Sequence, residues 1–158
     1  MNKDSGVNIL EFLPESAIVV DLKSQNKKEV LKELVKILDE AHSVRKPEQI
    51  LDALHEREEL GSTGIGQGIA IPHGKSECIN HVIAALGISK KGIEFDALDG
   101  ESVYLFFVLL APTNASGVHL KILAKISRLL KDKFFRQALR ESKSSEDVLK
   151  LIKEENEY

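Results

Sequence analysis

Hydrophobic and polar positions in the first part of the chain follow the periods of a strand and then of a helix. Residues 17–22 are short, apolar and rich in β-branched side chains, which predicts a first strand. Between Val30 and Ala41 apolar residues recur at intervals of three and four, the period of a helix with one buried face. We expect Ser24 to cap this helix and the helix to end near His42.

A second predicted helix is followed by a segment that no helix can occupy. The helix has Pro47 in its first turn, carries Arg57 on its inward stripe and ends at Gly61. The next segment, GSTGIGQGIAIPHG at residues 61–74, has five glycines and one proline in fourteen positions. Because these two residues are the poorest helix formers, we expect an irregular segment with a brief strand at residues 69–71.

The second half of the chain predicts two longer strands and three helices. The strands are expected at residues 81–89 and 103–110, and the second is continuously apolar, as in strands that are buried on both faces. The helices are expected at residues 118–130, 134–140 and 146–153, the first capped by Asn114 or Ser116 and the last by Ser144 or Ser145. This order of elements indicates an α/β protein with a mixed sheet that helices cover on both faces.

Composition narrows the class of protein. We expect the 158 residues to form a single domain, 1–158, with a core from about residue 10 to residue 155. Hydrophobic residues make up 42% of the chain and charged residues 30%, while 22 basic and 25 acidic residues give a formal net charge of −3. The chain lacks the basic excess of a nucleic-acid-binding protein. Its expected partners are therefore proteins or small molecules.

Other features argue against export, membrane insertion and metal binding. Cys78 is the single cysteine, which excludes an intrachain disulfide and a thiolate metal cluster and favours a reducing cytoplasm. The N-terminal residues lack the pattern of a secretory signal. The longest apolar run, residues 103–111, is far shorter than the ~20 residues of a membrane-spanning helix. No metal and no cofactor are expected, and His42, His55 and His81 are interpreted as surface or strand-end histidines.

His73 is the main candidate for chemistry. It should lie just past the brief strand, where Pro72 keeps the chain extended and Gly74 permits a tight exit. An imidazole with one unprotonated nitrogen is a nucleophile towards phosphorus, and phosphoryl transfer requires mainly alignment and charge stabilisation. Free backbone amides and hydroxyl groups of the segment could surround an anion. The candidate phosphate-binding residues are Ser62, Thr63, Gly64 and Gly74. A tight turn without a ligand is the alternative interpretation.

Two further residues are predicted to assist His73. His119 lies at the start of a predicted helix, where the amide dipoles favour an incoming dianion. Arg57 could hold phosphate oxygens or a carboxylate with its planar fork of donors. Glu58 or Glu59 is expected to orient the imidazole of His73. For His119 the alternative is a solvated helix-start residue, and for Arg57 it is an ordinary exposed or ion-paired side chain.

At these residues the chain resembles a known family. The stretch EREELGSTGIGQGIAIPHGK, residues 56–75, is similar to the phosphorylation site of enzyme IIA domains of the fructose and mannitol class. These domains belong to the bacterial phosphoenolpyruvate-dependent phosphotransferase system. The stretch GVHLKILAKISRLL, residues 117–130, is similar to the family's later segment, in which a second histidine opens a helix beside the first. The resemblance covers nearly the whole chain.

The resemblance implies both a fold and a reaction. The fold would be a three-layer α/β/α sandwich around a central mixed sheet. His73 would accept a phosphoryl group from a small HPr-like histidine phosphocarrier and donate it to a cysteine of an enzyme IIB domain. His119 matches the auxiliary histidine, and Arg57 matches an arginine near the active site.

The sequence is compatible with several functions. The order of GSTGIG and GIAIPHGK is closer to the nitrogen-regulatory, PtsN-like type, whose phosphorylation state controls potassium transport or nitrogen metabolism. A component of fructose or mannitol transport is the alternative within the family. A module of another class would hold a phosphorylated metabolite in the same concavity without covalent chemistry.

Overall fold

Helices and strands follow one another in the order that the sequence predicts. The computed structural model describes residues 7–156, so the outermost residues of the predicted 1–158 domain lie outside the described range. Two short 3-10 helices come first, η1 (Ile9–Glu11) and η2 (Glu15–Ala17). The strands are β1 (Ile18–Val19), β2 (Gly64–Gly66), β3 (Ile69–Ala70), β4 (His73–Lys75), β5 (Ile83–Ile93) and β6 (Val103–Ala111). The helices are α1 (Lys27–His42), α2 (Pro47–Glu59), α3 (Ser116–Leu129), α4 (Lys133–Glu141) and α5 (Ser145–Asn156).

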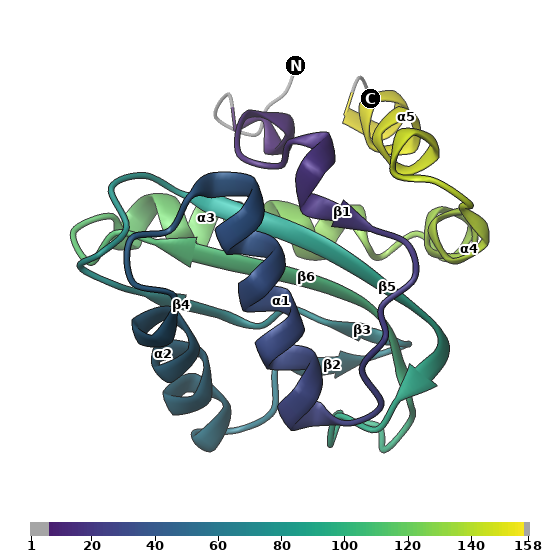
Figure 1. Ribbon diagram of the computed structural model, residues 1–158. Coiled ribbons are helices and arrows are strands. Elements are labelled where there is room, and N and C mark those ends of the chain that lie inside the picture. Colours follow the sequence, from purple (N-terminus) through teal and green to yellow (C-terminus); the bar gives the residue numbers. More distant parts are fainter. Residues whose placement is uncertain (1–6, 157–158) are drawn as a thin grey trace.

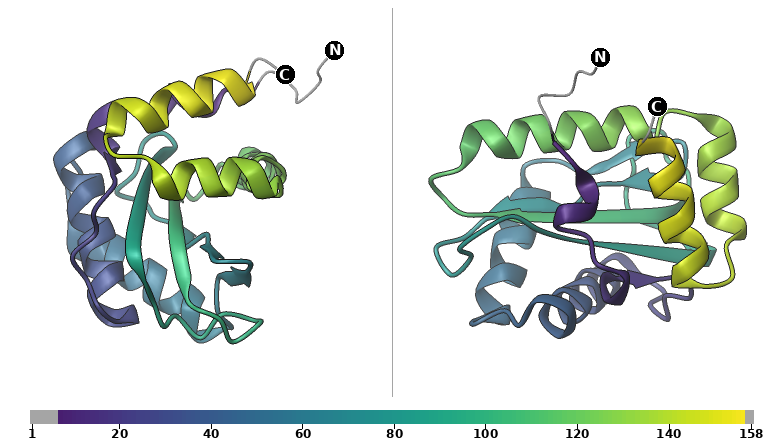
Figure 2. Two further views of the ribbon diagram at one scale, coloured as in Figure 1. Left: turned by 90° about the vertical axis from the view of Figure 1, so that its right-hand side faces the viewer. Right: turned by 90° about the horizontal axis from the view of Figure 1, so that it is seen from above.

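The strands form one mixed sheet in the middle of three layers. Their order is β1-β5-β6-β3-β2, with β4 also beside β6. Strands β5 and β6 are antiparallel, whereas β1 runs parallel to β5 and both β3 and β4 run parallel to β6. Helices α1 and α2 cover one face and α3 and α4 the other, while α5 packs near η1, η2 and β1 (Figures 1 and 2). This arrangement confirms the three-layer α/β/α sandwich.

Strand β6 is the centre of the core. Apart from partly buried Tyr104, each of its side chains is at most 1% exposed. Helix α1 buries its predicted stripe on one side of the sheet, and α3 contributes Ile122 and Ile126 on the other. Burying one such apolar side chain stabilises the fold by about 1.5–3 kcal/mol relative to leaving it in water. The continuous apolar run at residues 103–110 therefore correctly predicted the strand at the centre of the core.

Several predicted element ends were wrong. The first strand is shorter than predicted, because residue 17 belongs to η2 and residues 20–22 leave the strand. Helix α1 is capped by Asn26, whose side-chain oxygen accepts the Glu29 N–H at 2.9 Å. The hydroxyl of Ser24, the predicted cap, donates instead to the Glu33 carboxylate at 2.6 Å. Both residues are good caps, and the competing carboxylate decides between them.

The later elements show the same pattern of correct types and shifted ends. Strand β5 continues to Ile93, beyond the predicted end at residue 89, with a register shift between Ile88 and Ile93. The N-cap position of α3 is Ala115, so neither Asn114 nor Ser116 caps that helix with its side chain. At α5 the Ser144 hydroxyl accepts the Asp147 N–H at 3.1 Å, which confirms the predicted cap.

The glycine-rich segment is more regular than predicted. It contains β2, β3 and β4, and His73, which lies just past β3 as predicted, also begins the unpredicted strand β4. In register, Ile69 lies opposite Leu105 and His73 opposite Leu109, so β3 and β4 are two pieces beside one long strand. Pro72 separates them, because proline has no N–H for the ladder. Its carbonyl still accepts the Leu109 N–H at 2.9 Å. The pairing of β4 with β6 therefore places His73 beside Leu109.

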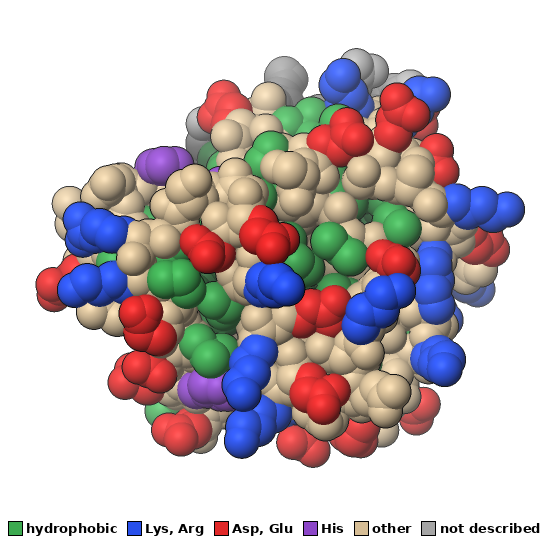
Figure 3. All heavy atoms as spheres, viewed as in Figure 1, with side chains coloured by type: hydrophobic (Ala, Val, Ile, Leu, Met, Phe, Trp, Pro, Cys, Tyr) green, Lys and Arg blue, Asp and Glu red, His purple; other side chains and the backbone are tan. Residues whose placement is uncertain are grey.

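Charges of both signs are mixed on the outer surface over α1 and α2. Acidic and basic side chains alternate there with small apolar areas, and this face has no continuous basic patch (Figure 3). No helix within residues 7–156 is both long enough and apolar enough to cross a membrane.

Gly64 tests how tightly β2 packs against the connection between β5 and β6. A Cβ atom added at this position would lie 2.9 Å from the Cα of Ala97, which is backbone and cannot rotate away. We expect Gly64→Ala to lower the free energy of unfolding by about 1–3 kcal/mol, the usual range for overpacking. Urea denaturation measures this change. Gly117→Ala is the control, because nothing lies within 4 Å of its added Cβ. Equal stability of the two variants would contradict the packing argument.

Candidate functional site

The three predicted catalytic residues meet in one pocket. The pocket has a volume of ≈ 320 Å³ and lies between the end of α2, strand β4 and the first turns of α3. The ring centroids of His73 and His119 are 5.5 Å apart, with the rings tilted by 59°. The lining residues are Arg57, His73, Gly74, Lys75, Ser116, His119, Leu120 and Leu123. Positions separated by 62 residues in the sequence thus share one opening.

A backbone hydrogen bond fixes the imidazole of His73. Its Nδ1 lies 2.7 Å from the carbonyl oxygen of Ile71. A carbonyl can only accept, so Nδ1 carries the proton and Nε2 of the neutral ring keeps its lone pair. Burial lowers the pKa of His73, while the bond to Ile71 opposes this effect and nearby Arg57 adds to it. The ring is therefore neutral at pH 7, as a nucleophile must be.

His119 places a second neutral imidazole beside the first. Only 4% of the residue is exposed, and its Nε2 is buried without a hydrogen-bond partner among the described residues. Burial, followed by repulsion from His73 and Lys75, lowers the pKa of His119 to about 4. Buried polar atoms normally have partners. The pocket thus offers a ring nitrogen that a ligand could satisfy.

Two cationic side chains flank the histidines. Arg57 uses one of its five donors on the carbonyl of Gly61, at 2.7 Å. The ammonium group of Lys75 donates to the hydroxyl of Ser116 at 2.8 Å and so links β4 to the first residue of α3. No role was predicted for Lys75. Residues two apart in a strand point to the same side, and His73 precedes Lys75 by two within β4, a strand that the sequence did not predict.

Gly74, a predicted phosphate-binding residue, lies in the pocket wall. A Cβ at this position would lie 3.4 Å from the side chain of Ala53 in α2. The bare backbone of Gly74 therefore permits close packing between β4 and α2.

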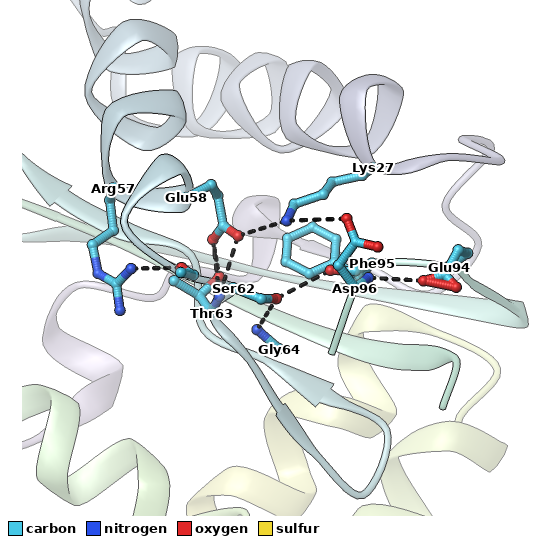
Figure 4. A network of polar contacts seen from close by, with 10 residues as sticks. Lys27, Arg57, Glu58, Ser62, Thr63, Gly64, Glu94, Phe95 and Asp96 are labelled. Carbon is cyan, nitrogen blue, oxygen red and sulfur yellow. Dashed lines mark hydrogen bonds and ion pairs between the residues drawn. The ribbon is translucent and has the colours of Figure 1, made fainter. Parts of the chain in front are cut away.

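The other predicted phosphate-binding residues, Ser62, Thr63 and Gly64, are not brought to this pocket. The Ser62 hydroxyl donates to the Phe95 carbonyl at 3.1 Å and accepts the Gly64 N–H at 3.0 Å (Figure 4). The Thr63 hydroxyl donates to the Glu58 carboxylate (Figure 4). Both hydroxyls are thus engaged within the protein and hold the loop between α2 and β2.

Neither predicted carboxylate contacts the imidazole of His73. Glu59 is exposed. Glu58 accepts hydrogen bonds from Thr63 and forms an ion pair with Lys27 at 3.0 Å. The Ile71 carbonyl orients the ring instead. Sequence reasoning missed this group because a carbonyl is present at every residue and only the fold shows which one is free.

Metal-binding groups do not gather at the site. Among residues 7–156, no three histidine, cysteine or acidic side chains are placed to hold a metal ion together. Cys78 is buried and free, with its sulfur 3.1 Å from the Ser76 hydroxyl. What the pocket offers is one nucleophilic nitrogen, one unpartnered ring nitrogen and two cations, a set that suits a phosphoryl group.

Known proteins resemble this chain along most of its length. A family model described as "Phosphoenolpyruvate-dependent sugar phosphotransferase system, EIIA 2" matches residues 11–155. A nitrogen regulatory protein of Bradyrhizobium diazoefficiens is 35% identical over 144 residues, which are 91% of this chain and 94% of that protein. The fructose-specific EIIABC component of Bacillus subtilis is 34% identical over 92% of this chain, and the matched part is 23% of that longer protein.

A solved structure agrees with these sequence matches. The crystal structure of the nitrogen regulatory protein IIA-Ntr from Neisseria meningitidis has a TM-score of 0.85 and 38% identity to this chain. The similarity covers 91% of this chain and 98% of that one. Since the family model spans nearly all of the described residues and a relative of similar length is 35% identical, the chain belongs to the EIIA 2 family of the phosphoenolpyruvate-dependent sugar phosphotransferase system.

Proposed function

We propose that this protein is a phosphocarrier that accepts a phosphoryl group on Nε2 of His73 and passes it to another protein. The hydrogen bond from Nδ1 to the Ile71 carbonyl carries this proposal, because it leaves the Nε2 lone pair free. A neutral imidazole in a cation-lined pocket is suited to attack phosphorus and to hold the product.

The transfer step is a displacement at phosphorus. The Nε2 lone pair of His73 forms a bond to the phosphorus of a donor phosphohistidine, and the donor's P–N bond breaks, which returns that electron pair to the donor ring. No proton has to move. The positive charge that develops on the ring of His73 is stabilised by the Ile71 carbonyl, which already accepts the Nδ1 proton. Transfer to the next protein reverses these steps.

The neighbouring groups stabilise the phosphoryl group. His119 supplies the unpartnered Nε2, and Arg57 and Lys75 supply positive charge. The first turn of α3 adds amide dipoles that favour an anion. Because these groups are in place before the reaction, little reorganisation accompanies transfer.

The partners are proposed to be proteins. Val118 and Leu120, in the first turns of α3, are 49% and 68% exposed beside the pocket, and exposed apolar side chains of this kind suit protein docking. We propose an HPr-like phosphocarrier as the donor and an enzyme IIB domain or a regulatory target as the recipient. A free buried Cys78 fits the cytoplasm as the compartment.

Within the family we propose the nitrogen-regulatory role, in which the phosphorylation state is the signal. The support is the similarity to IIA-Ntr of Neisseria meningitidis at 38% identity and to the nitrogen regulatory protein of Bradyrhizobium diazoefficiens at 35%. A sugar-transport component is the alternative, supported by the fructose-specific relative. The recipient separates them: a transport component passes label to a IIB cysteine, whereas a regulator binds its target differently in its two states.

The first test is phosphorylation of His73 itself. The protein is incubated with labelled phosphoenolpyruvate, enzyme I and an HPr-like phosphocarrier, and acid-labile phosphate is measured. We expect His73→Ala to incorporate no label, because Nε2 is the acceptor, while His81→Ala, which removes an exposed histidine, behaves like the parent. If His73→Ala gains label as fast as the parent, the proposal is wrong. A metabolite that binds without acid-labile phosphate would favour the non-covalent module.

The protonation of His119 should report the arrival of phosphate. Burial keeps its pKa at about 4 in the free protein, so the ring is neutral at pH 7. A phosphoryl dianion on His73 favours the charged form, and the pKa of His119 should therefore rise on phosphorylation. NMR titration of the imidazole measures both states. A donor-treated His73→Ala variant should show no rise, and an unchanged pKa in the phosphorylated parent would place His119 away from the phosphate.

His119 is also expected to affect the transfer rate without being the acceptor. We predict that His119→Ala still accepts label, but about 100-fold more slowly, the effect of losing one preorganised donor. Rapid-quench measurement of the single-turnover rate tests this prediction. Rates equal to those of the parent would remove His119 from the reaction.

A further inference from the structure

We propose that Glu58 and Thr63 are positioning residues that set the tautomer of His73 by fixing the Ile71 carbonyl. Neither side chain contacts the imidazole; both act through the backbone. The inference builds on the proposed role of His73 as acceptor, and it adds a set of contacts outside the pocket on which that role depends.

Glu58 holds Thr63 with two different groups. One carboxylate oxygen accepts the Thr63 N–H at 3.1 Å, and the other accepts the Thr63 hydroxyl (Figure 4). The Glu58 side chain is only 6% exposed, and Thr63 is 3% exposed. Two bonds to one residue in a buried site leave it little freedom to move.

Thr63 in turn holds Ile71, and Ile71 holds the catalytic ring. The Thr63 carbonyl accepts the Ile71 N–H at 3.0 Å, and the Ile71 carbonyl accepts the Nδ1 proton of His73 at 2.7 Å. An unbroken series of hydrogen bonds therefore connects the Glu58 carboxylate to the imidazole. The groups that fix one ring nitrogen decide which tautomer the ring adopts, and so which nitrogen is the nucleophile.

The stability of the fold alone does not explain why Glu58 carries a charge that pairs with Lys27. Its carboxylate pairs with Lys27 at 3.0 Å, and the ammonium group of Lys27 lies 4.6 Å from the ring centroid of Phe95. Replacing a buried ion pair by well-packed apolar side chains of similar volume often leaves the stability of a fold unchanged or raises it. The benefit of this pair is instead geometrical, because it ties α1 and α2 to the loop that carries Thr63 (Figure 4).

The chain contains a matched control for the hydrogen bonds between Glu58 and Thr63. Glu33 holds Ser24 in the same way, accepting its N–H at 2.9 Å and its hydroxyl at 2.6 Å. Ser24 follows β1 and precedes α1, and none of its hydrogen bonds leads towards His73. Ser24→Ala therefore removes the same kind of contact without affecting the ring.

The test compares Thr63→Val, Thr63→Ser, Glu58→Gln and Ser24→Ala in the unphosphorylated protein. Nitrogen-15 chemical shifts of the His73 ring report the share of each tautomer, and the single-turnover rate of phosphoryl acceptance is measured beside them. In Thr63→Val, which keeps the side chain's shape, we expect the Nδ1–H share to fall and the rate to drop about 10-fold. Glu58→Gln should change both in the same direction, whereas Thr63→Ser and Ser24→Ala should match the parent.

The outcomes separate this inference from the proposed function. Parent-like ring shifts in both Thr63→Val and Glu58→Gln would overturn the positioning role, even if His73 is phosphorylated normally. The same holds if Ser24→Ala alters the ring as much as Thr63→Val. A tautomer change in a protein that never accepts phosphate would support the positioning role and refute the phosphocarrier function. If Thr63→Val fails to fold, Glu58→Gln decides the question.

Discussion

The proposed chemistry of this protein depends on one backbone carbonyl group beside a break in the sheet. Pro72 interrupts the strand beside β6, so that β3 ends before it and β4 begins after it. The Ile71 carbonyl at this break accepts a proton from the ring two residues later. The Pro72 carbonyl accepts the Leu109 N–H of β6, whereas Ile71 donates its N–H to the Thr63 carbonyl and so pairs on the side away from β6. On that side its carbonyl is available to fix the ring of the proposed nucleophile.

The pocket combines neutral rings with fixed positive charges. Burial lowers the pKa of both His73 and His119, while Arg57 and Lys75 remain beside them as cations. An empty pocket of this kind holds more positive charge than negative charge. A phosphoryl dianion would neutralise these two positive charges, so groups that are already in place would favour the proposed phosphorylated state. The two tethers that hold the cations, to Gly61 and Ser116, keep them within reach.

Local patterns predicted the types of the elements, and long-range contacts decided the details. The continuous apolar run of β6 and the periodic stripes of α1 and α3 are properties of neighbouring residues, and these predictions were confirmed. Asn26 caps α1 in place of Ser24, whose hydroxyl is bound by Glu33, nine residues later. Such competition between distant groups is not visible in a local pattern.

The distinction between local patterns and long-range contacts also applies to the candidate site. His73, His119 and Arg57 were found from their local settings and from the family resemblance, and the structure brings them together. Ser62 was expected at the phosphate, but its hydroxyl donates to the carbonyl of Phe95, 33 residues later. Glycines and hydroxyls in one segment predict a loop that could bind an anion. They do not reveal whether another part of the protein already uses those groups.

The two outermost strands of the sheet are very short, two residues in β1 and three in β2, whereas the central strands β5 and β6 have eleven and nine. A sheet edge with so few unpaired backbone groups is a poor template for strand addition by another chain. A protein that meets its proposed partners briefly and releases each of them would benefit from this property. Short edges favour encounters through side-chain surfaces and disfavour aggregation through exposed strand edges.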